Sequence, residues 1–249
     1  MKTSKGIIVS LILGICAIIC TSIFGFSVLT YKKTGNAAGV TATGSASCDF
    51  ESDLIVWRGS FSATAATSAD AYNIIKRDSE TIHKYLADNK VTEDEMVFSS
   101  VNISQNYTSQ YNDNGDYIGD IPGDYCLSQE VCITSSDVDK VEKISRDISA
   151  LIESGVEFTS NSPEYYYTKL DELKLQLIQD ATENAKQRAD IIAQGTGSSL
   201  GDLLSANLGV FQITATNSAS DDYSYGGTFN TDSRNKTATI TVKINYAVK

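Results

Sequence analysis

The sequence predicts an α+β fold in which helices pack on an antiparallel or mixed sheet, preceded by one N-terminal transmembrane helix. Three observations support this prediction: an uncharged apolar run at residues 6–30, segments of period two that indicate strands, and segments of period 3.6 that indicate helices. Strand pairs interleaved with helices are typical of the α+β class. The 249 residues are 41% hydrophobic and 9% aromatic, which is enough to build a folded core.

The apolar run is long enough to cross the roughly 30 Å hydrocarbon core of a bilayer as a helix. Two lysines precede it and two follow it, and the terminal amine slightly favours an N-terminus inside the cell. We therefore predict a signal-anchor with basic flanks at residues 1–33, a linker at 34–39 and an extracytoplasmic domain at 40–249, in a single-pass protein of a cell membrane. The alternative is a cleaved secretory signal that releases a secreted or periplasmic domain, although the apolar regions of such signals are usually only about 7–15 residues long.

The first elements after the linker are two strands and a helix. Small apolar and hydroxyl residues alternate over residues 40–48, and another alternating run follows an acidic turn, so the two runs are expected to pair as a hairpin. Ser68 and Asp70 are typical helix-start residues, and the apolar positions after them keep helical spacing until about Asn89.

The middle of the chain predicts two longer strands and a second helix. The strands cover about 96–107 and 124–134, joined by a polar hairpin tip. Ser136 then opens a helix that ends before Gly155, and a short strand is expected at 156–159.

The last third predicts the longest soluble helix and two strands. The sequence Ser-Pro-Glu at residues 162–164 is a strong helix start, so the helix is expected at 164–194. Alternation of apolar and polar residues predicts strands at about 210–215 and 238–248, with a polar loop between them.

Several of these features together resemble a known family. The stretch VTATGSASCDFESDLIVWRGSFSA combines an alternating small-residue strand, a glycine, an acidic turn and a second strand, and the chain closes on TATITVKINYAVK. The long helix and the turn after it carry Ala181, Ala185, Ala189, Gly197, Leu200 and Gly201. In this order of elements, residues 39–249 resemble the SIMPL-domain family. Two positions depart from the family pattern: Ser52-Asp53 stands where Pro-Asp is frequent, and Asn89-Lys90 where a glycine is frequent.

The resemblance implies an extracytoplasmic α+β protein related to bacterial periplasmic immunogenic proteins. It also implies an ability to form homo-oligomers. It supplies no catalytic residue and no cofactor, because no catalytic reaction is assigned to the family.

Composition excludes several classes of function. Four of the 20 basic residues flank the apolar run, which leaves 16 basic against 31 acidic groups and a formal charge of −15 on the rest of the chain. Such a surface repels nucleic acid and anionic lipid. The single histidine, His83, has no nucleophile signature beside it, so we interpret it as a helix-surface residue and expect no enzymatic activity.

The acidic loop around residues 112–116 is the best metal candidate in the sequence. Asp113, Asp116 and Asp120 are weak calcium candidates, because Ca²⁺ takes clustered oxygen ligands. The loop lacks the spaced ligands and closing glutamate of an EF-hand, and its Asn-Gly pair is a hairpin signal, so we favour a turn without metal.

Three consecutive tyrosines form a candidate interface. Tyr165, Tyr166 and Tyr167 could build an aromatic recognition patch, and at least one of them is expected to face the sheet.

Cys48, Cys126 and Cys132 lie outside the apolar run and could form a disulfide in an oxidising compartment. Cys126 and Cys132 are six residues apart on one expected strand, about 20 Å at strand rise, so they cannot bridge each other. An internal disulfide would therefore join Cys48 to Cys126 or Cys132; reduced cysteines are the alternative.

Two functional hypotheses follow. The first is a non-enzymatic, membrane-anchored protein of the cell envelope that forms a homo-oligomer or binds another envelope component. The second is a small-ligand or cation binder, or a hydrolase, that uses a carboxylate-lined cleft near residues 112–124. The missing nucleophile and metal signatures favour the first.

Overall fold

The computed structural model describes residues 14–15, 18–28, 39–218 and 224–249, and it confirms the α+β class. Of the predicted signal-anchor and linker, residues 1–13, 16–17 and 29–38 lie outside the described residues. Residues 14–15 and 18–28 are helical. Among the described residues, no helix has the length and apolar character needed to cross a membrane.

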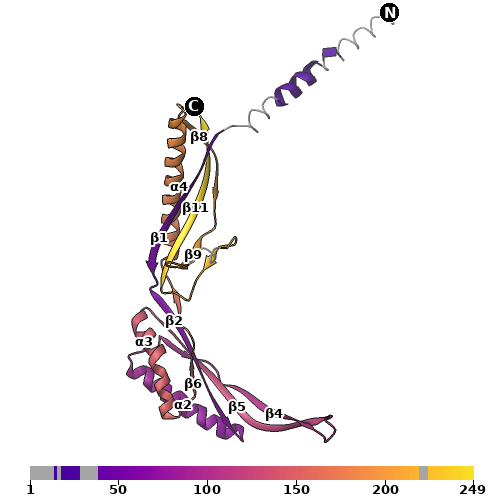
Figure 1. The fold of residues 1–249 in the computed structure, drawn as a ribbon, viewed down its shortest axis with the longest axis vertical. Helices are drawn as coiled ribbons and strands as arrows, with labels where there is room; N and C mark the ends of the chain where they lie inside the picture. The colour runs from indigo at the N-terminus through magenta and orange to yellow at the C-terminus, as the bar shows by residue number, and fades with distance from the viewer. Residues whose placement is uncertain (1–13, 16–17, 29–38, 219–223) are drawn as a thin grey trace, which may run out of the picture. The chain divides into compact units, whose positions relative to one another are not determined.

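The chain folds into two compact units (Figure 1). Unit 1 contains the residues up to Ala46 together with Ile178–Gly209 and Thr241–Lys249, and unit 2 contains Ser47–Leu177 and Val210–Ile240. The strands are β1 (Gly39–Glu51), β2 (Leu54–Ala65), β3 (Met96–Phe98), β4 (Asn102–Tyr111), β5 (Tyr117–Ser135), β6 (Phe158–Ser160), β7 (Glu164–Tyr166), β8 (Leu200–Leu208), β9 (Gln212–Ala215), β10 (Thr228–Phe229) and β11 (Asn235–Val248). The helices are α2 (Ser68–Asp88), α3 (Val138–Asp147), the 3₁₀ helix η1 (Ile148–Ser154) and α4 (Leu170–Gly195).

In unit 2 the central pair is β2 and β5, which run antiparallel from Ile55 opposite Ser135 to Ala65 opposite Tyr125. Alternate residues of β2 are buried, as the period of two requires, and they include Trp57 with no exposed surface. Helices α2 and α3 cover this face of the sheet (Figure 1). The result is one continuous hydrophobic core that contains the only tryptophan of the chain.

Helix α2 occurs where the sequence predicts it, with Thr67 as the N-cap residue that accepts a hydrogen bond from the backbone N–H of Asp70. Asp137 caps α3 in the same way, and Gly155 ends η1 with φ of 81°. These caps satisfy backbone groups that have no partner inside a helix. α2 therefore ends where the sequence predicts, whereas the second predicted helix is α-helical only to Asp147 and continues as the 3₁₀ helix η1 to Ser154.

In unit 1, α4 packs directly on β1. Gly44 makes this close approach feasible, because a Cβ atom there would lie 2.3 Å from the carbonyl oxygen of Ala181 and 2.3 Å from the nitrogen of Ala185. Asn184 accepts a hydrogen bond from the backbone N–H of Ser45, and Arg188 donates one to the carbonyl of Thr43. The small residues of the predicted alanine repeat are therefore the contact surface of the helix.

The expected hairpin between the first two strands is wrong. β1 pairs with β11 in a five-stranded sheet, whereas β2 belongs to the six-stranded sheet with β5. The turn between them is held by other segments, because Ser52 donates its N–H to the carbonyl of Arg234 and Asp53 donates to that of Tyr166. Two adjacent alternating runs thus fit a hairpin in sequence but take long-range partners instead.

Two other elements differ from their expected extent, and one strand was not expected. The longest helix begins at Leu170, because residues 164–166 form β7 and pair with Leu54–Val56 of β2. Strand β8 was not predicted. Most of the polar segment expected as a hairpin tip is strand, since β4 extends to Tyr111 and β5 begins at Tyr117.

Candidate functional site

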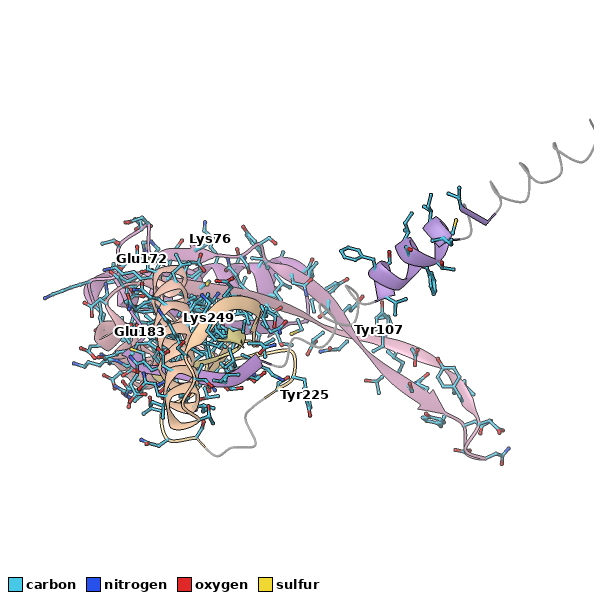
Figure 2. All side chains as sticks on the ribbon, turned by 90° about the horizontal axis from the view of Figure 1, so that it is seen from above. Lys76, Tyr107, Glu172, Glu183, Tyr225 and Lys249 are labelled. Carbon is cyan, nitrogen blue, oxygen red and sulfur yellow. The ribbon has the colours of Figure 1, made fainter. Side chains whose placement is uncertain are left out.

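A two-stranded ribbon, formed by β4 and residues 117–124 of β5, is the most unusual surface of unit 2. β2 ends opposite Tyr125, so in the described part of the chain residues 117–124 pair only with β4. The ribbon extends past α2 and α3 (Figure 1), and Tyr107 stands on it in Figure 2. Isolated two-stranded ribbons are marginally stable in water, so we expect the surface of this ribbon to take part in an interaction.

One face of the ribbon exposes three large apolar side chains of β4, with Gln105 and Ser109 between them and Asp120 opposite Ser109 on β5. Ile103 lies opposite Leu127, which is buried in the core, so the odd-numbered residues of β4 continue the core-facing side of the sheet. Ile103, Tyr107 and Tyr111 are 55%, 60% and 63% exposed. An uncovered apolar surface of this kind marks an interaction site.

The other face of β4 is polar and carries no charge. It presents Ser104, Asn106, Thr108 and Gln110. The ribbon as a whole has no basic group, because no lysine or arginine occurs between Lys90 and Lys140. Its charged residues are aspartates only.

The tip of the ribbon is a closed turn. The side-chain oxygen of Asn112 accepts hydrogen bonds from the N–H groups of Asn114 and Asp116, each at 2.9 Å. Gly115 has φ of 85°, which favours glycine there. The tip is thus ordered by its own side chains.

The calcium candidates lie on this tip and on β5. Asp116 accepts a hydrogen bond from the side chain of Asn112, and Asp120 accepts one from the Ser109 hydroxyl at 2.7 Å. Asp120 also accepts from the hydroxyl of Tyr117, which raises the pKa of that phenol. Among the described residues no group of three or more His, Cys, Asp or Glu side chains could hold a metal ion. The weak calcium candidates Asp113, Asp116 and Asp120 stay an untested alternative to the turn without metal that the sequence favours.

A buried lysine lies in unit 2, where the segments around Ser52, Tyr165 and Ser233 meet. Lys236 is 1% exposed, and its ammonium donates to the Ser52 hydroxyl at 2.8 Å and to the carbonyls of Tyr165 and Ser233. Its nitrogen also lies 5.8 Å from the centre of the Tyr165 ring. Burial lowers the pKa of Lys236 from 10.5 to about 8. Because no substrate can reach an enclosed amine, we interpret it as a structural tie.

An ion-pair cluster adjoins this lysine and borders an open hollow. Arg234 contacts the carboxylates of Glu51 and Asp139, with Glu142 at 3.7 Å. The hollow has a volume of about 550 Å³, and its lining consists of Glu51, Ser52, Asp53, Ser136, Asp137, Val138, Asp139 and Arg234. Several of these carboxylates already have partners: Asp137 caps α3 and Asp53 accepts two hydrogen bonds from Thr168. The hollow is polar and contains neither histidine nor cysteine.

Glu95 is the carboxyl whose pKa departs most from its usual value. Burial alone would raise the pKa, but hydrogen bonds from Lys140, Ser135 and the backbone N–H of Thr92 outweigh burial and lower it to about 2. The Lys140 nitrogen lies 2.8 Å from Glu95. This pair ties the loop before β3 to α3 and is structural.

The three tyrosines of the candidate interface are each engaged within the chain. The hydroxyl of Tyr165 donates to Glu142 at 2.9 Å, and burial together with this bond raises the pKa of Tyr165 to about 12. Tyr166 donates to Glu164, and the ring of Tyr167 lies 4.8 Å from that of Phe50. Of these three tyrosines, only Tyr165 packs against the hydrophobic core. An interface role for all three stays a prediction.

Cys48, Cys126 and Cys132 are free thiols in the structure, as is Cys20. Cys126 and Cys132 lie on β5, opposite Thr64 and Arg58 respectively, whereas Cys48 lies on β1 in the other sheet. His83 pairs with Glu93 at 2.9 Å on the surface of α2.

The sequence analysis did not predict the ribbon or the burial of Lys236, although the sequence contains a pattern that indicates each of them. Ile103, Tyr107 and Tyr111 are spaced by four residues, which puts them on one face of a strand. Lys236 falls in the same alternation as Ala238 and Ile240, so its register indicates burial.

The family model named SIMPL, described as a protein of unknown function (DUF541), matches residues 40–246. The chain belongs to the SIMPL family. The match covers most of the chain and includes strands from both units of this SIMPL protein. A comparison with curated proteins gives no match.

Proposed function

We propose that this SIMPL protein is a non-enzymatic, membrane-anchored protein of the bacterial cell envelope whose extracytoplasmic domain self-associates or binds another envelope component. The observation that carries the proposal is the ribbon, because Ile103, Tyr107 and Tyr111 continue the core-facing side of the sheet and are exposed. No cofactor or nucleic acid takes part.

Charge supports a protein partner over the other classes of partner. The ribbon carries aspartates and no basic residue, so it repels phosphate groups of nucleic acid or of anionic lipid. The strand β4 is uncharged and combines two tyrosines and an isoleucine with hydroxyl and amide side chains, which resembles the composition of protein interfaces.

The anchoring part of the proposal is supported by the uncharged run at residues 6–30 and its flanking lysines. Membrane fractions washed with alkaline carbonate should retain the full chain, and added protease should reach unit 2 only from the extracytoplasmic side. Release of the intact protein by the wash, or protection of unit 2 from outside, would refute this part.

The self-association part is tested by light scattering on the full chain, purified in a mild non-ionic detergent, over a wide range of concentration. A discrete oligomer that forms with rising concentration supports the proposal. A monomer at all concentrations that also retains no envelope protein after cross-linking in cells would refute it.

The second candidate function, a small-ligand or cation binder or a hydrolase, is supported by the carboxylate-lined hollow beside Arg234. Calorimetric titration with calcium chloride tests its cation form, with Asp137→Ala for the hollow and Asp113→Ala for the ribbon tip. A heat signal lost in only one variant would locate the site, and no signal would remove the cation form of this candidate.

A further inference from the structure

We propose that two copies of this chain pair through the outer edges of their β4 strands, antiparallel, with Tyr107 of each copy on the two-fold axis. This inference rests on the self-association part of the proposed function and assigns the surface that carries it. The partner of the ribbon is thus a second copy of this chain.

The two edges of the ribbon differ in how well they could accept another strand. The β5 edge contains Gly119, Pro122 and Gly123, and aspartates at Asp120 and Asp124. Proline, glycine and charge are the features that block pairing at sheet edges. The β4 edge, NISQNYTSQY, contains no proline, glycine or charged residue.

Register confirms the difference between the edges. From Gln105 to Tyr107, β4 advances two residues while its partner changes from Tyr125 to Pro122, so the extra residue lies on β5. The second shift, near Tyr111, again adds the residue on β5, because the partner changes from Gly119 to Tyr117. β4 is therefore the regular strand and β5 the bulged one, and bulges hinder pairing.

The sequence of β4 is complementary to itself about Tyr107. Directly opposed residues of antiparallel strands share a face, so a two-fold axis at Tyr107 keeps the apolar residues of both copies on one side. Ile103 then lies opposite Tyr111 of the second copy, and Tyr107 opposes its own equivalent. On the polar face the same register pairs Ser104 with Gln110 and Asn106 with Thr108, all uncharged hydrogen-bonding groups.

The antiparallel arrangement also separates like charges. The two ribbons point in opposite directions, so their acidic tips lie at opposite ends of the joined four-stranded sheet. A parallel arrangement would bring the tip aspartates of the two copies together. The strand edges alone bury less than the roughly 800 Å² per partner of a stable interface, so concentration-dependent assembly is expected.

Disulfide trapping in the full chain tests the register, with the parent chain as baseline for the natural cysteines. Tyr107→Cys places two thiols opposite each other, about 4.5–5.5 Å apart at Cα, within disulfide range. Ile103→Cys is the matched control, because the two copies of residue 103 are eight positions out of register, roughly 27 Å. We expect a cross-linked dimer from Tyr107→Cys, none above baseline from Ile103→Cys, and a dimer again when Ile103→Cys is mixed with Tyr111→Cys.

Charge variants test the same contact without a covalent cross-link. Tyr107→Lys places two like charges on the axis and should raise the dissociation constant at least tenfold, whereas Ile118→Lys, an exposed residue on β5, should leave it unchanged. An equimolar mixture of Tyr107→Lys and Tyr107→Asp should restore the dimer, because opposite charges then meet. A variant that merely unfolds the ribbon could not be restored in this way.

The outcomes separate this inference from the proposed function. If the parent chain assembles but Tyr107→Cys gives no cross-link above Ile103→Cys, the β4 contact is overturned and self-association by another surface remains. If the parent chain is a monomer at all concentrations, both the contact and self-association are overturned.

Discussion

Raising the pH from 7 to 10 is expected to stabilise unit 2 through Lys236. The perturbation is deprotonation of a buried ammonium whose three hydrogen-bond acceptors are neutral oxygens. The comparison is with Lys236→Met, which has similar volume and no ionisable group. We follow the difference in free energy of unfolding between the parent chain and this variant.

The magnitude follows from the two pKa values of Lys236. The pKa is about 8 in the folded state and 10.5 in the unfolded state, so between these values the unfolded chain binds more protons. Stability therefore rises with pH, by about 2.5 kcal/mol between pH 7 and pH 10. We stop the pH range at 10 because of Tyr165. Its pKa is about 12 in the folded state and 10 in the unfolded state, so above about pH 10 the unfolded chain loses the phenol proton first and stability falls.

Urea denaturation, monitored by the fluorescence of Trp57, measures this difference. Trp57 is the only tryptophan and is fully buried in unit 2, so its signal reports on the unit that contains Lys236. The reasoning is refuted if the parent and Lys236→Met curves stay parallel from pH 7 to pH 10, or if the difference falls.

Two further predictions concern single contacts. Glu95→Gln should lower the free energy of unfolding by about 2–3 kcal/mol at pH 7, and the difference should shrink as the pH falls from about 4.5 to about 2, because the stabilisation from a lowered carboxyl pKa is lost in that window. A pH series of urea curves measures this, and a difference that stays constant down to pH 2.5 would count against it. Gly44→Ala should destabilise unit 1 by about 1–3 kcal/mol, because the added Cβ overlaps backbone atoms of Ala181 and Ala185. Thermal circular dichroism would show a lowered transition temperature, and an unchanged one would contradict the close packing of α4 on β1.

Local signals in the sequence were sufficient for α2, for the start of α3 and the end of η1, and for β11. Thr67 and Asp137 cap α2 and α3, Gly155 stops η1, and these devices act within a few residues of each other. Strand partners depend on distant residues. β7 has a proline-preceded helix start in sequence but forms a strand because β2 supplies a free edge for it.

Part of the site was accessible to the same reasoning and part was not. The spacing of Ile103, Tyr107 and Tyr111 defines a face, but sequence alone does not reveal that these side chains stay exposed among the described residues. The burial of Lys236 follows from its place in the alternation of β11, whereas its three acceptors come from segments far away in the chain. Element order does not determine which segments meet.

The pairing of β1 with β11 has a consequence for the order in which the protein can assemble. β1 is made before α4 and β9, and β11, its neighbour in the sheet, follows only after them. Until then Gly44 and the alanine face of α4 have an incomplete sheet to pack on. Unit 1 can therefore close only once β11 has been made, while the core of unit 2, contained between Ile55 and Phe158, can form earlier.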